Sequence, residues 1–239
     1  MLLLVGGCRT AAVALPGGAI VVAGPQVVPG ASRPAPPRPE RARCPVIGNC
    51  VPLYAFDEVV SEASAQRAIT WIRAQREAGA QALVIKIDTP GGEVEAGFKL
   101  INTMRSVGIP TYCVVDDKAY SMGFAILQAC TVRLATTHAT LMIHAAALGL
   151  FDGERRPTGP SPVPPDADDA RIIGVKAVSQ VMAQHCAARM KVSLDEYLQR
   201  TSGDWWMNGR EALGYGALDH VMVSVESVHR YVLAGLHLP

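Results

Sequence analysis

Runs of consecutive apolar residues alternate along the middle of the chain with segments whose apolar residues recur every three or four positions. The runs at 82–87 and 111–115 are rich in Val and Ile, which predicts buried strands. The segment 94–106 between them predicts a helix that ends before Gly108 and Pro110. This order of elements indicates an α/β fold.

A helix is also predicted before the first of these strands, because apolar residues there follow the i, i+3, i+4, i+7 spacing of a buried helix face. These residues are Ala65, Ala68, Ile69 and Ile72. We expect Ser64 to cap this helix and Gly79 to end it.

The rest of the chain continues the alternation of predicted strands and helices. Further strands are predicted at 51–56, 132–135, 141–143 and 220–225, and further helices at 122–129 and 168–190, the last opened by Asp166, Asp168 and Asp169. Two more short helices begin at the capping boxes Ser193–Glu196 and Asn208–Glu211, and a frayed amphipathic tail ends the chain. We expect a mostly parallel sheet flanked by helices, with right-handed crossovers. The five prolines and three glycines of 148–165 predict a loop or lid.

Composition divides the chain into a compact part and a leader. With 239 residues and 49% hydrophobic residues, the chain can bury one substantial core. Seven prolines between 25 and 45 favour extended, solvated chain. We therefore predict a leader at 1–24, a Pro-rich linker at 25–49 and one domain at 50–239.

The first eight residues resemble the end of a bacterial lipoprotein signal, because an apolar run leads to small residues and then Cys8. The resemblance implies export and a lipid anchor on Cys8, with a cytoplasmic location as the alternative. Pro16, Gly17 and Gly18 interrupt the only neighbouring apolar stretch, which is too short to cross a membrane.

Charge and cysteine content exclude several classes of function. The net charge of +1, without a large block of one sign, does not predict a basic surface of the kind that binds nucleic acid. The six cysteines form no CxxC pair, so no zinc spacing is present and no metal site is predicted. Cys113 and Cys130 are expected to be small buried hydrophobes, and Cys44 with Cys50 is the pair near enough in sequence for a local bridge.

Three short motifs stand where predicted strands end. They are 88–92 (Asp-Thr-Pro-Gly-Gly), 119–123 (Ala-Tyr-Ser-Met-Gly) and 141–144 (Leu-Met-Ile-His). Because parallel strands gather reactive groups at their carboxyl ends, we expect an active site there. Ser121 would lie on a strand-to-helix turn that exposes its hydroxyl, and His144 would lie near enough to act as its base. The structural alternatives are a Ser121 that only caps a helix and a structural His144.

Together with Thr-Ser-Gly-Asp-Trp-Trp-Met at 201–207, Glu211-Ala212 and Tyr-Gly-Ala-Leu-Asp at 215–219, these motifs resemble the proteolytic subunit of Clp protease, in the ClpP/crotonase superfamily. The resemblance covers roughly 51–225. It implies repeated β-β-α and β-α units with a projecting handle helix. It also implies a Ser121, His144 and Asp204 triad that hydrolyses peptide bonds through an acyl-enzyme, as a serine endopeptidase without a metal or organic cofactor.

The same resemblance assigns further roles. Backbone N–H groups of Gly91, Gly92 and Met122 would form an oxyanion hole, and Glu93 and Val94 would line the substrate cleft. The implied substrate is a peptide or unfolded protein. The implied partners are further copies of the chain, in a hexameric or heptameric ring that can stack, whereas an ATPase unfoldase partner is left open.

Three departures from the Clp pattern leave alternatives open. Tyr120 stands where relatives carry a small residue, Ala145 and Ala146 replace a Gln-Pro pair, and the next loop is long and Pro-rich. A bulky Tyr120 favours a catalytically inactive scaffold as one alternative. Lys118 suggests a Ser-Lys dyad like that of signal peptide peptidase A, and the shared superfamily suggests an enzyme acting on acyl-CoA.

The helix at 168–190 is apolar on more than one side, which predicts burial between subunits. By resemblance it is the handle through which Clp rings stack. We expect an interface containing Val175, Val178, Val181 and Met182.

Overall fold

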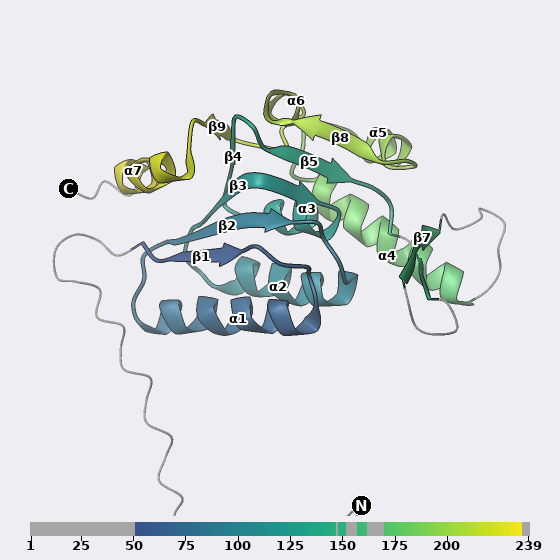
Figure 1. Ribbon diagram of the computed structural model, residues 1–239, viewed down its shortest axis with the longest axis horizontal. Coiled ribbons are helices and arrows are strands. Elements are labelled where there is room, and N and C mark those ends of the chain that lie inside the picture. The colour runs from purple at the N-terminus through teal and green to yellow at the C-terminus, as the bar shows by residue number, and fades with distance from the viewer. Residues whose placement is uncertain (1–50, 147, 152–156, 162–169, 236–239) are drawn as a thin grey trace, which may run out of the picture. The chain divides into compact units, whose positions relative to one another are not determined.

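The computed structural model describes residues 51–146, 148–151, 157–161 and 170–235, all of which belong to the unit Ala42–Pro239. The predicted leader and linker, Cys8, Cys44 and Cys50 lie outside the described residues, as do the three aspartates expected to open the long helix. Figure 1 shows a twisted sheet with helices on both faces.

The main sheet has seven strands. They are β1 (Leu53–Phe56), β2 (Leu83–Thr89), β3 (Thr111–Tyr120), β4 (Val132–Thr136), β5 (Thr140–Ile143), β8 (Trp205–Asn208) and β9 (His220–Met222). Strands β1, β2, β3, β4 and β9 follow one another in parallel, and β5 branches from β3 in parallel. Strand β8 pairs antiparallel with β5. The predicted α/β class and mostly parallel sheet are confirmed.

Of the seven helices in the described residues, six lie between these strands in sequence and α7 follows the last strand. They are α1 (Glu62–Glu77), α2 (Val94–Ser106), α3 (Met122–Leu127), α4 (Ala170–Ala187), α5 (Leu194–Arg200), α6 (Gly209–Gly214) and α7 (Val225–Gly235). The predicted bounds of α2 agree with the structure. The cap of α1 was predicted wrongly, because Ser61 is the cap and Ser64 takes the third helical position of a capping box.

Strand β3 is longer than the sequence predicted and divides the sheet into two branches. Its first half pairs with β4 and its second half, Lys118–Tyr120, pairs with β5. The polar residues Asp116, Asp117 and Lys118 broke the apolar run, so the strand was predicted to end at Val115. This second half leads directly to Ser121.

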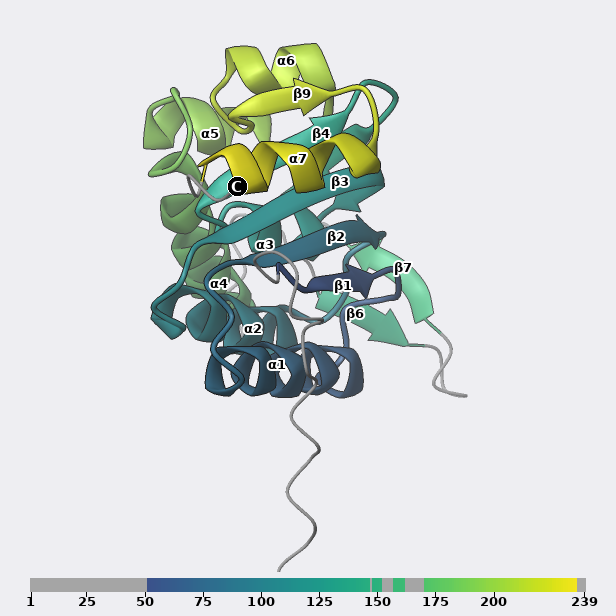
Figure 2. The same cartoon turned by 90° about the vertical axis from the view of Figure 1, so that its left-hand side faces the viewer.

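One face of the sheet packs on α1, α2 and α3 to form the main core. Leu83, Ile85 and Ile87 alternate along β2 toward these helices and are buried. On the other face Val84, Val114 and Leu134 pack against α7. Figure 2 shows α7 lying across this face, so the predicted frayed tail is instead an ordered helix with a buried stripe.

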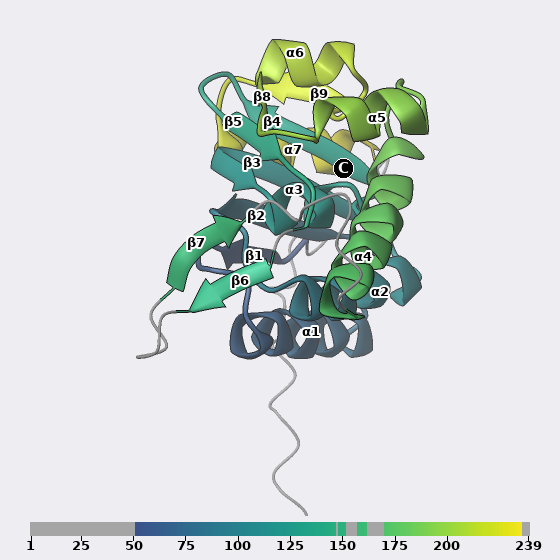
Figure 3. The ribbon, with the colours of Figure 1, turned by 90° about the vertical axis from the view of Figure 1, so that its right-hand side faces the viewer.

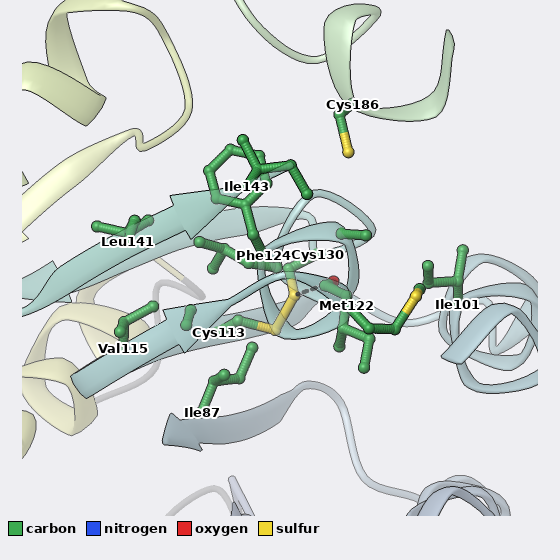
Figure 4. Packing of buried hydrophobic residues seen from close by; sticks show 14 of the residues in the cluster. Ile87, Ile101, Cys113, Val115, Met122, Phe124, Cys130, Leu141, Ile143 and Cys186 are labelled. Atoms are coloured by element: carbon green, nitrogen blue, oxygen red, sulfur yellow. Dashed lines mark hydrogen bonds between the residues drawn. A yellow bond between two sulfur atoms is a disulfide. The ribbon is translucent and has the colours of Figure 1, made fainter. Parts of the chain in front are cut away.

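A disulfide joins Cys113 on β3 to Cys130, just after α3. Both cysteines are buried, and Figure 4 shows the bond beside Met122 in the core. The expectation that they are free hydrophobes is therefore wrong. The two cysteines are 17 positions apart in sequence, and only the packing of α3 against β3 brings them together.

The proline-rich segment and the long helix after it both differ from expectation. Strands β6 (Leu148–Phe151) and β7 (Pro157–Ser161) form an antiparallel hairpin, which Figure 3 shows apart from the main sheet. On α4, Val178 and Val181 are exposed, whereas Met182 lies in the core. Met182 is therefore not available for an interface between subunits.

No helix of the described residues is long and apolar enough to cross a membrane.

Candidate active site

Three neighbouring strands bring the predicted catalytic residues to one edge of the sheet. Tyr120 is paired with Met142 on β5, and Ile143 is paired with Trp205 on β8. If the β5–β8 ladder continued by one residue, His144 would lie opposite Asp204, and Ser121 directly follows the adjacent strand β3. Directly opposed residues of an antiparallel pair have Cβ atoms about 5 Å apart.

Ser121 occupies a strained turn between β3 and α3. Its φ of 51° and ψ of −116° make it the only residue other than glycine with positive φ in the described ranges. Its N–H donates to the Met142 carbonyl at 2.7 Å, which ties the turn to β5. Its side chain makes no capping hydrogen bond to α3, so the simple helix-cap interpretation of this serine is not supported.

His144 and Asp204 lie at the open end of the β5–β8 ladder. His144 is half-buried, and its Nδ1 lies 2.7 Å from the carbonyl oxygen of Ala145. Asp204 is exposed in the connection between α5 and β8. Among the described residues no hydrogen bond joins the side chains of Ser121, His144 and Asp204, so their proposed roles rest on placement.

The Gly-Gly loop lies directly against Ser121. A Cβ on Gly91 would come within 2.8 Å of the Ser121 Cβ, and one on Gly92 within 2.1 Å of the Val60 carbonyl oxygen. Both glycines have positive φ, so the close approach and the backbone conformation both require glycine.

The loop's N–H groups have different uses. The Gly91 N–H donates to Thr89 Oγ1 at 3.1 Å, whereas the N–H groups of Gly92 and Met122 have no hydrogen bond among the described residues. Gly92 is exposed and Met122 begins α3. The oxyanion-hole role predicted for these two N–H groups therefore has no competing protein acceptor among the described residues.

The two predicted cleft residues follow the loop. The Glu93 carboxylate accepts from the Glu62 N–H at 3.2 Å, so this side chain is directed toward the start of α1. Val94 begins α2 and is half-buried against the core. Val94 therefore has the more limited exposure of the two.

Lys118 is engaged by carboxylates. Its Nζ lies 3.1 Å from Asp88 Oδ1 and 3.4 Å from Asp117 Oδ2. The hydrogen bond to Asp88, helped by the charge of Asp88, raises the pKa of Lys118. A lysine that acts as a general base must lose its proton, so this environment opposes a Ser121–Lys118 dyad.

Tyr120 is directed along the sheet. Its hydroxyl lies 2.7 Å from Thr140 Oγ1, and its ring packs edge-on against Trp206 with centroids 5.0 Å apart. These contacts turn the side chain toward β5 and β8. Trp206 was missed as a site residue because β8 was not predicted, although the alternation of buried Trp205 and Met207 with exposed Trp206 and Asn208 is typical of a strand.

Known proteins are similar to most of this chain. The Clp protease family matches residues 55–225. The chain is 32% identical over 175 residues to ATP-dependent Clp protease proteolytic subunit 1 of Chlamydia trachomatis serovar D, covering 71% of this chain and 85% of that protein. The corresponding subunit of Chlamydia muridarum is 31% identical, with the same coverage.

A solved structure also shares the fold. A ClpP1 mutant from Listeria monocytogenes superposes with a TM-score of 0.63 at 17% identity, covering 74% of this chain and 94% of that chain. The sheet, its flanking helices and the extent of the family match define a ClpP-like peptidase of the α/β class. The chain belongs to the Clp protease family.

Proposed function

We propose that this protein is a serine endopeptidase that uses Ser121 as nucleophile, His144 as general base and Asp204 to orient the imidazole. The observation that carries the proposal is the register of β3, β5 and β8, whose ladders end one residue before these three side chains. A serine on a strained strand-to-helix turn, next to a strand-end histidine, suits nucleophilic attack on a carbonyl.

In the proposed reaction, His144 Nε2 takes the Ser121 proton as Oγ attacks the scissile carbonyl carbon. The N–H groups of Gly92 and Met122 would stabilise the negative oxygen of the tetrahedral intermediate. The amine then leaves with the proton from His144, and water hydrolyses the remaining ester through the same base. The engagement of the Gly91 N–H by Thr89 favours Gly92 as the loop's donor.

The His144 side chain has to turn for this reaction. Nδ1 contacts the Ala145 carbonyl in the structure, and a triad requires that N–H to face Asp204 instead. Catalytic hydrogen bonds commonly form only in the substrate complex. We propose that an extended substrate bound beside the Gly-Gly loop favours the turned imidazole.

Fluorophosphonate labelling tests the nucleophile directly. We expect wild type to be labelled and Ser121→Ala to be unlabelled. Ser202→Ala is the matched control, because Ser202 is exposed two residues before Asp204 and its hydroxyl donates to the Gln199 carbonyl. Labelling that persists in Ser121→Ala would contradict the proposal, as would peptide hydrolysis that survives that substitution.

An inactive scaffold is the second candidate, and the contact of His144 Nδ1 with Ala145 is the observation that favours it. An inactive protein would assemble without labelling or hydrolysis. Turnover of short fluorogenic peptides by wild type, lost in His144→Ala, would exclude it.

We propose further that subunits assemble into a hexameric or heptameric ring acting on peptides or unfolded proteins, and that Cys8 anchors the protein outside the cytosol. The disulfide supports the second point, because such bonds persist in oxidising compartments. Mass spectrometry of the mature N-terminus would detect a diacylglyceryl group on Cys8. An unmodified Met1 in native protein would contradict the anchor.

A further inference from the structure

Asp204 directly precedes strand β8, which has few pairing partners in the sheet. Strand β8 lies at an edge of the sheet and pairs only with β5 among the described strands. Side chains alternate between faces, so a shift of one residue in that pairing would turn Asp204 away from His144 and exchange the positions of Trp205 and Trp206. Whatever fixes the register of β8 therefore fixes Asp204.

On the core face, Trp205 anchors the strand. Its ring packs edge-on against Tyr197 and Tyr215, and the Arg200 guanidinium lies 5.1 Å from its centroid. Trp205 is buried, with 8% of its surface exposed. These contacts are local, because Tyr197 lies on α5 before β8 and Tyr215 caps the end of α6 after it.

On the opposite face, Tyr120 makes the contact that crosses the sheet. Tyr120 lies on β3, which does not pair with β8, yet its ring reaches over β5 to Trp206 with centroids 5.0 Å apart. Its hydroxyl meets Thr140 of β5 at 2.7 Å. The Tyr120 side chain thus contacts both strands that adjoin the other two proposed catalytic residues.

The contact also lies next to the site. Tyr120 and Trp206 are both register partners of Met142, and residues two apart on a strand share a face. His144 follows Met142 by two residues, and Asp204 precedes Trp206 by two. The aromatic pair therefore forms the row adjacent to His144 and Asp204 on the same face.

We infer that Tyr120, Thr140 and Trp206 form an aromatic clamp that holds β8 in the register that places Asp204 opposite His144. Tyr120 is then a positioning residue, and its bulk serves the site instead of blocking it. The inference rests on the proposed function for its catalytic consequence, but the clamp itself is a property of the fold.

Hydrogen exchange tests the clamp without any activity. In a Ser121→Ala background, Tyr120→Ala should speed exchange of the β8 amides about tenfold relative to those of β2, since aromatic pairs make a measurable contribution beyond their buried area. Tyr120→Phe keeps the ring contact and should retain most of the protection. Tyr231→Ala removes another edge-on aromatic contact, with Tyr112, and should leave β8 unchanged. Unchanged β8 protection in Tyr120→Ala would overturn the clamp.

Kinetics on the otherwise wild-type protein test the catalytic consequence. Tyr120→Ala and Trp206→Ala should each lower kcat about tenfold with little change in KM, and the double variant should be no slower than either, because both remove one contact. Rescue by Tyr120→Phe would support positioning by the ring. If the losses in kcat of the two single variants multiplied in the double variant, the two residues would not act through one contact and the clamp would be overturned. A Tyr120→Ala enzyme faster than wild type would show that Tyr120 obstructs the site, which would also overturn the inference. Wild type without hydrolysis would contradict the proposed function, while the exchange result would still decide the clamp.

Discussion

Ser121 shows how a single residue combines strain and function. Its φ and ψ lie in a region that side-chain-bearing residues rarely occupy, and the surrounding bonds to β5 hold it there. The sequence predicted the turn from the change between an apolar strand and a small-residue helix. It did not predict the strain, because backbone dihedral angles depend on the tertiary contacts around Gly91 and Met142.

Substitutions of Ser121 separate the effect of backbone strain on stability from the effect of the hydroxyl on activity. We expect Ser121→Gly to be more stable than Ser121→Ala by about 1 kcal/mol, because glycine relieves a strain of about 1 to 3 kcal/mol while adding freedom to the unfolded chain. Both variants should be inactive. Urea unfolding midpoints of the two proteins measure the difference. A Gly variant less stable than the Ala variant would show that the turn is unstrained.

Among the helices and strands, the sequence predicted those whose bounds are set by residues within the same segment. Helix α2 agrees in both bounds because its apolar stripe and the Gly108 stop are read within one segment. Strand β8 and helix α7 were missed, since each is stabilised by distant partners: β8 by β5, and α7 by Val84 and Val114. Asp204 was therefore predicted by resemblance to a family motif, and its place directly before a strand that pairs with β5 required the sheet register.

A buried ion pair links β4 to the segment before β9. Arg133 is almost fully buried and bonds Asp219 Oδ1 at 2.7 Å, with further bonds to the carbonyls of Arg189 and Gly216. Burial acts to raise the pKa of Asp219, but the hydrogen bonds and charge of Arg133 lower it overall. The carboxylate therefore stabilises the fold above its unfolded pKa, and this stability is lost as the pH falls through the lower, folded value.

This linkage predicts a pH-dependent effect of Asp219→Asn. At pH 7 the variant should lose about 2 kcal/mol, less than for a fully buried pair because Asp219 is partly exposed. The difference from wild type should begin to shrink below about pH 4, where the carboxylate of the unfolded chain takes up a proton, and should disappear as the pH falls through the lower folded pKa. Urea midpoints measured at both pH values test this. A difference independent of pH would exclude the ion pair as its source.

The disulfide closes the stretch of chain that contains Ser121. Because it constrains a loop of 17 residues, we expect reduction to cost wild type about 3 kcal/mol of unfolding free energy. The stability of the double variant Cys113→Ala, Cys130→Ala should no longer depend on reductant. The control Cys186→Ala should keep that dependence, because Cys186 is a free, buried thiol. Thermal unfolding with and without dithiothreitol measures the effect. Equal sensitivity in the double variant would contradict a structural role for this bond.

Among the described residues, helix α4 exposes several apolar side chains. Ile173, Val178 and Val181 of α4 are exposed by 58%, 37% and 52%, although the same helix buries Met182 and Cys186 in the core. The apolar character on several sides of α4 predicted an interface, and exposed apolar residues on one side are compatible with it. The sequence did not distinguish the two sides, because both are apolar and only the packed fold shows which one the core covers.

We therefore expect Val178→Asp to convert an oligomer into a monomer, because a charge buried without a partner between subunits is costly. Gln180→Asp is the matched control, since it adds the same charge to an exposed polar position of the same helix and should leave assembly intact. Hydrolysis should fall with assembly, because α5 and Asp204 follow α4 and depend on its placement. Light scattering with a peptidase assay measures both properties. A wild type that is monomeric and active would contradict the interface and its coupling to catalysis together, whereas a monomeric and fully active Val178→Asp would contradict only the coupling.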